Sequence, residues 1–132
     1  MGDDRLHDTK TMSEYRYYEF LSIERPLTAD EMAELRALST RATITPVSFT
    51  NVYNWGDFKG DPEKLMQRYF DAHVYVANWM TAILMVRLPI EALTQETAKA
   101  ATVPYLLDIE ATKTHWIITW SLEESENYDR FG

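Results

Sequence analysis

Residues 106–122, LLDIEATKTHWIITWSL, contain the pattern that decides the fold class. The second half of this stretch alternates large apolar side chains with mostly polar ones, which is the period of two typical of a strand with one buried face. The apolar set consists of Trp116, Ile118, Trp120 and Leu122. We expect this set to face the core. The polar segment 112–114 predicts a hairpin between residues 106–111 and 115–122, and hence antiparallel pairing.

Two helix starts upstream of this hairpin are marked by capping residues. Thr28 and Glu31 have the spacing of a capping box, in which each side chain accepts a hydrogen bond from the backbone N–H of the other residue. Asp61-Pro62 combines an N-cap with a proline at the first helical position. Apolar residues at helical spacing follow both signals. The sequence therefore predicts helices over 29–39 and 62–78.

Runs of apolar, aromatic and β-branched residues predict further strands at 15–23, 41–53 and 82–88. Pro46 predicts an edge, a bulge or a bend within the second run, because proline cannot donate to a strand ladder. A weak helical signal covers 90–101. The resulting order is β-α-β-α-β-(α)-β-β. It predicts an α+β fold with two main helices on one face of a mostly antiparallel sheet of about five strands.

Length and charge restrict the organisation and the partners of the chain. Its 132 residues fit one domain, and we predict a flexible leader at 1–13, a single domain at 14–122 and an acidic tail at 123–132. The absence of cysteine excludes thiolate metal sites and fits a reducing cytoplasm. The net charge of −8 disfavours nucleic acid as a partner. The longest apolar stretch, 74–86, is shorter than the roughly 20 residues of a membrane-spanning helix.

The usual catalytic motifs are missing from the sequence. It contains no Gly-x-Ser-x-Gly motif and no glycine-rich phosphate loop, and its three histidines lack metal-ligand spacing. His73 falls on the apolar face of a predicted helix, where we expect a buried histidine with a hydrogen-bond partner. We therefore predict no catalytic set, no cofactor and no metal ion.

The segment 51–62, NVYNWGDFKGDP, holds two of the four glycines of the chain together with two large aromatic residues. Aromatic side chains within a polar rim are typical of a protein-binding hot spot. The residues that we predict to contact a protein partner are Asn54, Trp55, Asp57, Phe58 and Lys59. The opposing interpretation is that Trp55 and Phe58 fold back onto the edge of the sheet.

Several motifs in the first two-thirds of the chain carry a family resemblance. They are Tyr17-Tyr18-Glu19-Phe20, Arg25-Pro26-Leu27-Thr28, Ala37-Leu38-Ser39-Thr40-Arg41-Ala42, Ile44-Thr45-Pro46, Trp55-Gly56-Asp57-Phe58-Lys59-Gly60-Asp61-Pro62, Tyr75-Val76-Ala77-Asn78-Trp79 and Arg87-Leu88-Pro89. Together they resemble the N-terminal region of an uncharacterised bacterial protein family with no established activity. The resemblance implies a domain or a short relative of a larger protein. The chain departs from the family pattern after Trp79, where Met80, Ala82 and Ile83 replace the expected small and basic residues.

Three functions are compatible with these patterns. The first is a non-enzymatic domain that binds a protein partner or associates with itself, and the missing catalytic motifs favour it. The second is a small metal-dependent hydrolase or nuclease-like enzyme that uses Asp57, Asp61 or Glu63. The third is an acidic inhibitor that mimics nucleic acid. It requires stripes of carboxylates on one face, whereas the sequence scatters them along every element.

Overall fold

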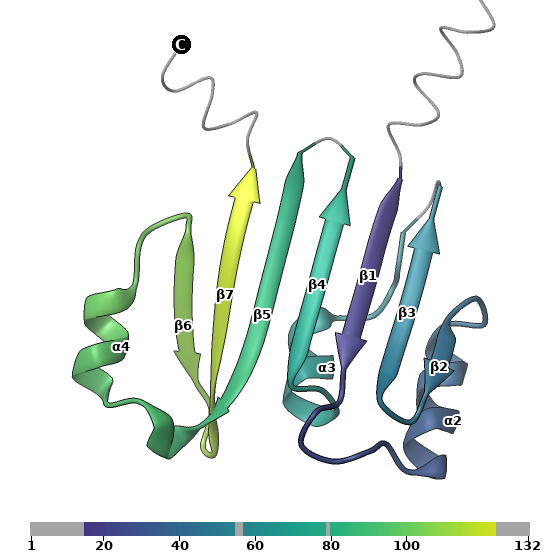
Figure 1. The fold of residues 1–132 in the computed structure, drawn as a ribbon, viewed down its shortest axis with the longest axis horizontal. Coiled ribbons are helices and arrows are strands. Elements are labelled where there is room, and N and C mark those ends of the chain that lie inside the picture. The colour runs from purple at the N-terminus through teal and green to yellow at the C-terminus, as the bar shows by residue number, and fades with distance from the viewer. Residues whose placement is uncertain (1–14, 55–56, 79, 124–132) are drawn as a thin grey trace, which may run out of the picture.

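The computed structural model describes residues 15–54, 57–78 and 80–123 (Figure 1). In chain order, the elements are β1 (Arg16–Leu21), α2 (Ala29–Leu38), β2 (Thr43–Thr45), β3 (Ser48–Tyr53), α3 (Pro62–Arg68), β4 (Ala72–Ala77), β5 (Thr81–Pro89), the 3-10 helix η1 (Ile90–Ala92), α4 (Gln95–Ala101), β6 (Leu107–Ala111) and β7 (His115–Glu123). The predicted leader and all but the first residue of the predicted tail lie outside the described residues.

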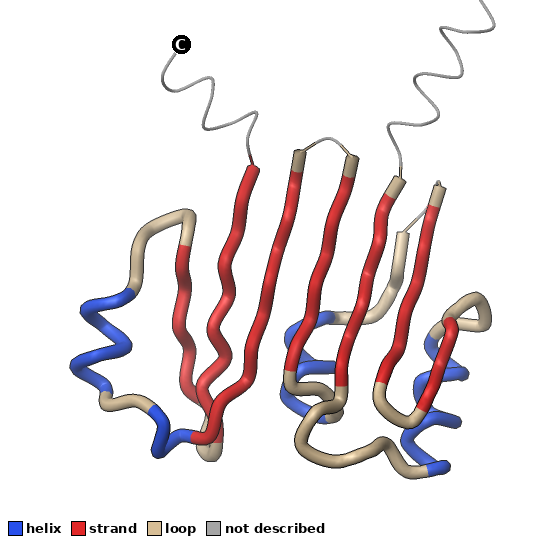
Figure 2. The backbone as a smooth tube through the Cα atoms, viewed as in Figure 1, coloured by secondary structure: helices blue, strands red, loops and turns tan. Residues whose placement is uncertain are grey.

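The strands of the described residues form one seven-stranded sheet with the order β2-β3-β1-β4-β5-β7-β6 (Figure 2). Every pair of neighbours is antiparallel. The predicted α+β class with an antiparallel sheet is therefore confirmed, although the sheet has more strands than the five predicted. One additional strand comes from a turn at Pro46-Val47, which divides the run 41–53 into β2 and β3 at the predicted bend. The other is β4.

The helix predicted over 62–78 is wrong beyond its second turn. Asp61 caps α3 as expected, since its side chain accepts a hydrogen bond from the Glu63 N–H at 3.0 Å. The helix ends at Arg68, and residues 72–77 form β4 between β1 and β5. This segment is rich in aromatic and β-branched residues, which suit a strand paired on both sides. Pairing along both edges outweighs the helical spacing of its apolar residues.

The helix α2 matches its prediction to within one residue. The Glu31 N–H donates to the Thr28 hydroxyl at 3.1 Å, and the Thr28 N–H donates to the Glu31 carboxylate at 2.9 Å. Leu27, just before the cap, is buried, and its N–H donates to the Pro46 carbonyl at 2.7 Å. The capping box and this backbone bond together fix the start of α2 against the β2–β3 turn.

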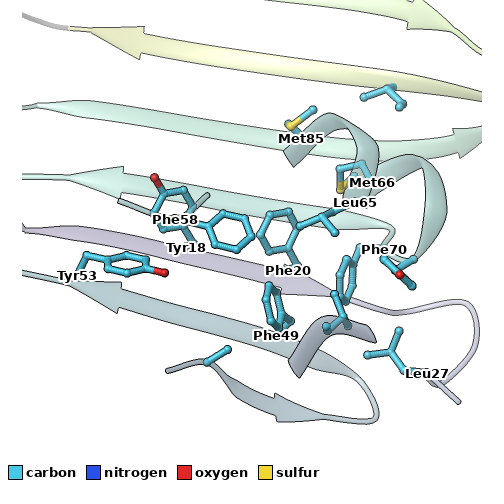
Figure 3. Packing of buried hydrophobic residues seen from close by; sticks show 14 residues of the cluster. Tyr18, Phe20, Leu27, Phe49, Tyr53, Phe58, Leu65, Met66, Phe70 and Met85 are labelled. Atoms are coloured by element: carbon cyan, nitrogen blue, oxygen red, sulfur yellow. The ribbon is translucent and has the colours of Figure 1, made fainter. Parts of the chain in front are cut away.

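The main core lies between the sheet and the helices α2 and α3, which lie behind the strands in Figure 1. Phe20 is fully buried at its centre beside Phe70, and the centroids of the two rings are 5.2 Å apart (Figure 3). The ring of His73 lies 3.9 Å from that of Phe20, centroid to centroid. Aromatic pairs at such distances contribute beyond their buried area. The buried residues of this core come from β1, β3, β5, β7, the helices α2 and α3, and the loops that flank these helices. Tyr75 of β4 is partly buried and packs against them.

The hairpin of β6 and β7 is confirmed, whereas the expectation that its tryptophan face is buried holds only for Trp116 and Ile118, and these lie outside the main core. Ile117, on the other face of β7, is 2% exposed and joins the main core. Trp116 is buried on the opposite side of the sheet, where its indole N–H donates to the Ile90 carbonyl of η1 at 2.8 Å. Trp120 and Leu122 are 40% and 57% exposed. Both faces of β7 carry apolar residues, so the alternation alone does not identify the covered face.

Candidate functional site

The predicted partner-binding loop divides into buried and exposed positions. Asn54, Asp57 and Lys59 are exposed, and Trp55 lies outside the described residues. Phe58 is only 7% exposed, so its assignment to a contact surface is corrected: its ring packs 5.4 Å from that of Tyr18. The alternative interpretation, in which this ring folds back, is confirmed for Phe58.

Gly60 makes room for the buried phenylalanine. A Cβ atom at Gly60 would lie 2.3 Å from Cζ of the Phe58 ring, far closer than two carbon atoms approach without repulsion. Only glycine therefore permits this position of the ring. The glycine in the loop serves the packing of the core, which explains part of the composition that pointed to a binding loop.

Asp57 anchors the same loop to the sheet. Its carboxylate accepts hydrogen bonds from the Tyr18 hydroxyl and, at 2.8 Å, from the Phe58 N–H. Nε of Arg16 lies 3.9 Å from the same carboxylate oxygen. Burial of Tyr18, and then its hydrogen bond to Asp57, raise the pKa of the tyrosine above its ordinary value. These contacts account for an aspartate at position 57 as an anchor of the loop, without a catalytic role.

The loop carboxylates do not form a metal centre in the described residues. Asp61 is engaged as the N-cap of α3, whereas Asp57 is bonded to Tyr18. The described part of the chain contains no group of three or more histidine, aspartate or glutamate side chains placed to hold a metal ion. The site required by a metal-dependent hydrolase is therefore not assembled by these residues.

A cavity of about 450 Å³ opens over the helix-covered face of the sheet. Strand residues Tyr75, Ile83, Met85 and Thr119 line its floor, and the start of α3 contributes Glu63. The register places Tyr75 opposite Ile83 and Met85 opposite Thr119, so these side chains share one face. Neither the helices nor the core rings fill this part of the face, which leaves a mostly apolar hollow next to charged groups.

His73 lies between this cavity and the core. It is 2% exposed, and its Nδ1 lies 3.0 Å from the backbone oxygen of Glu19. A carbonyl oxygen only accepts hydrogen bonds, so Nδ1 carries the proton and Nε2 is an acceptor. Burial lowers the pKa of His73 to about 4, which keeps the ring neutral at pH 7. The predicted buried histidine with a partner is confirmed, but on a strand rather than a helix.

Carboxyl groups from distant segments lie near Glu63 at the rim of the cavity. They belong to Asp61 in the preceding loop and to Glu110 and Asp108 on β6. A hydrogen bond with Glu110, followed by burial and the neighbouring charges, raises the pKa of Glu63 to about 7. These carboxyl groups make the rim a region of negative potential. Nothing in the spacing of these residues along the sequence indicates that they meet.

The sheet face opposite α2 and α3 carries apolar residues in rows that cross the strands. The first row comprises Val52, Tyr17, Val76, Ala82 and Leu122 on β3, β1, β4, β5 and β7. The second comprises Thr50, Glu19, Val74, Leu84 and Trp120 on the same strands. We call these two rows the open face. Adjacent apolar members across five strands make it one continuous surface.

The open face is accessible in the described part of the protein. Val52, Val76, Leu84, Trp120 and Leu122 are between 39% and 57% exposed. The helix α4 lies beside β6, and its neighbours on this face are Ile109, Ala111 and Trp116, beyond the two rows (Figure 1). Glu19 is the only carboxylate in the two rows, and it accepts a hydrogen bond from the Tyr17 hydroxyl at 2.9 Å. Soluble monomers rarely expose apolar patches of this kind.

Comparison with protein-family models, curated proteins and solved structures found no match to this chain. The family resemblance of the motifs therefore stays a prediction. None of the helices in the described ranges is long and apolar enough to cross a membrane.

Proposed function

We propose that this protein is a non-enzymatic assembly domain whose open face packs against the same face of a second copy. The observation that carries the proposal is the first row, which crosses five strands without a break, together with the apolar members of the second row on β4, β5 and β7. An antiparallel sheet commonly packs one face on the core and exposes the other to solvent, and the solvent-exposed face is then polar. Here the part of that face that α4 does not cover is apolar instead, which is the composition of a face that packs against another layer.

The size of the open face fits a small but specific interface. Strands lie about 4.8 Å apart and residues on one face of a strand about 7 Å apart, so five strands with their side-chain margins cover roughly 500 Å². A symmetric pair would bury about 1,000 Å² in total, the lower limit for a biological interface. The expected dimer is therefore reversible and depends on concentration.

The pattern of the open face favours a copy of itself as the occupant. A two-fold interface brings the same patch of both partners together, so apolar rows meet apolar rows. Two sheets packed in this way lie about 10 Å apart and cross at about 30°. Glu19 lies on β1 and pairs with Val74, beside the apolar centre that Val76, Ala82 and Leu84 form on β4 and β5. Its carboxylate therefore borders this centre and does not belong to it.

Replacing Leu84 by lysine tests the proposal in solution. Leu84 is 40% exposed, and completing its burial in both copies contributes about 2 kcal/mol. Leu84→Lys is expected to weaken the dimer at least about 30-fold, because the lysines must also lose water. Leu38→Lys is the matched control, since Leu38 is 41% exposed at the end of α2, away from the open face.

Sedimentation equilibrium over a range of protein concentrations measures the average mass of each variant in solution. The wild type and Leu38→Lys are expected to approach twice the 15.4 kDa chain mass as concentration rises, while Leu84→Lys stays at the mass of one chain. Thermal melts show that each variant is folded. A wild type that remains a monomer at millimolar concentration, or a folded Leu84→Lys that dimerises as the wild type does, contradicts the proposal.

A further inference from the structure

We propose that the cavity over the helix-covered face binds a small organic cation, with its ammonium group at the Glu63 rim and an apolar body against the strand residues. The cavity lies on the opposite side of the sheet from the open face. The inference is therefore independent of self-association and can fail or succeed separately.

The cavity has the dimensions and the lining of a ligand site. Its volume of about 450 Å³ falls within the 300–1,000 Å³ typical of small-molecule sites. Tyr75, Ile83 and Met85 provide an apolar floor, to which β1 adds Tyr18. Such sites combine an apolar lining with few polar groups that set the orientation of the ligand.

The polar groups around the cavity whose roles the structure defines are acceptors. Nε2 of His73 carries no proton, because Nδ1 donates to the Glu19 carbonyl. The hydroxyl proton of Tyr18 is donated to Asp57. The rim adds the carboxylate of Asp61, which also caps α3, and the carboxyl group of Glu63, which is an acceptor once it is ionised. A ligand that fits this set donates hydrogen bonds and carries positive charge, as a primary ammonium group does.

Two aromatic rings strengthen the preference for a cation. The ring of Tyr18 lies 4.8 Å from that of Tyr75 at an interplanar angle of 50°, and both residues line the cavity. Aromatic faces attract ammonium groups within about 6 Å of the ring centre. Tyr18 is buried, so of the two rings that of Tyr75 is the one open to the cavity, between the apolar floor and the Glu63 rim.

The paired carboxyl groups supply the charge that an ammonium group neutralises. Glu63 on α3 faces Glu110 and Asp108 on β6 and Asp61 in the preceding loop. Protonation of Glu63 reduces the repulsion in this group. An ammonium group at the rim does the same, and its binding favours the ionised form of Glu63. Binding near pH 6.5 is therefore expected to release a proton from Glu63.

Phenethylamine is a suitable probe, because it joins a primary ammonium group to one aromatic ring. Its uncharged counterpart 2-phenylethanol has the same ring and chain, and phenylacetate carries the opposite charge. Isothermal titration calorimetry at pH 6.5 is expected to show that phenethylamine binds at least tenfold more tightly than 2-phenylethanol, with no binding of phenylacetate. Titration in two buffers of different ionisation enthalpy is expected to show proton release.

Substitutions at the cavity rim and at a distant control position test where phenethylamine binds. Glu63→Gln keeps the shape of the rim and is expected to weaken phenethylamine binding at least tenfold and to abolish proton release. Glu91→Gln, at an exposed position of η1, is the matched control and is expected to bind as the wild type does. Thermal melts establish that both variants fold. No binding of phenethylamine to the wild type, equal binding of 2-phenylethanol, or equal effects of the two substitutions would overturn the inference.

Discussion

His73 makes the stability of the protein depend on pH in a way that can be calculated from the structure. Its pKa is about 4 in the folded protein because the ring is buried, compared with about 6.5 in an unfolded chain. As the pH falls below 6.5, the unfolded chain binds a proton that the folded protein does not bind until pH 4. The contribution of His73 is therefore complete above pH 6.5 and is lost between pH 6.5 and 4. Linkage gives a loss of about 2.5 kcal/mol between pH 7.5 and 4.5.

The substitution His73→Phe removes the titrating group while keeping an aromatic ring on Phe20. It also removes the hydrogen bond to the Glu19 carbonyl, which lowers stability by about 1 kcal/mol at every pH. Glu63 titrates in the same range with the opposite sign: its pKa is raised to about 7, so its contribution is complete below pH 4.5 and is lost as the pH rises towards 7. The difference between wild type and variant cancels this second effect.

Urea unfolding at pH 7.5, 6.5, 5.5 and 4.5, followed by tryptophan fluorescence, to which the buried Trp116 contributes, measures that difference. The free energy of unfolding of the wild type minus that of His73→Phe is expected to fall by about 2.5 kcal/mol from the highest to the lowest pH, so the variant becomes the more stable protein at pH 4.5. An advantage that stays constant within about 0.5 kcal/mol refutes the assignment of His73 as a neutral, buried ring.

Two further substitutions test the packing that positions these surfaces. Gly60→Ala is expected to destabilise the protein by about 1–3 kcal/mol in thermal or urea unfolding, because the new methyl group displaces the Phe58 ring. The control is Lys59→Ala at the exposed neighbouring position, which should change the free energy of unfolding by less than about 0.5 kcal/mol. Asp71→Asn is expected to cost about 3–5 kcal/mol, because the buried Arg87 guanidinium loses its ion partner at 2.9 Å, and an unchanged urea midpoint would contradict it.

Local signals predicted local structure well. The capping box of Thr28 and Glu31 and the cap at Asp61 act within four residues of the chain, so the starts of α2 and α3 follow from the sequence. Pro46 fixed the β2–β3 turn for the same reason, since its missing N–H is a property of the residue itself. The hairpin of β6 and β7 also follows from adjacent segments.

Features that depend on distant pairing were missed. The end of α3 at Arg68 and the strand β4 depend on pairing with β1 and β5, and helical spacing in residues 69–77 concealed that preference. Phe58 belongs to the core because β1 and β3 present Tyr18 and Phe49 to it. The cavity and the carboxyl groups at its rim depend on the packing of β6 near α3. The open face depends on the register of five strands. The sequence contains no motif that marks the cavity or the open face.

Cross-linking through the open face tests self-association most directly. The chain contains no cysteine, so Ala82→Cys introduces one thiol near the centre of the first row, and Leu38→Cys introduces one on α2. Facing sheets lie about 10 Å apart, a span that a short bismaleimide covers. The proposal predicts covalent dimers of Ala82→Cys and only traces for Leu38→Cys. A dimer by sedimentation in which Ala82→Cys remains uncrosslinked, or in which both variants crosslink equally, would contradict assembly through this face.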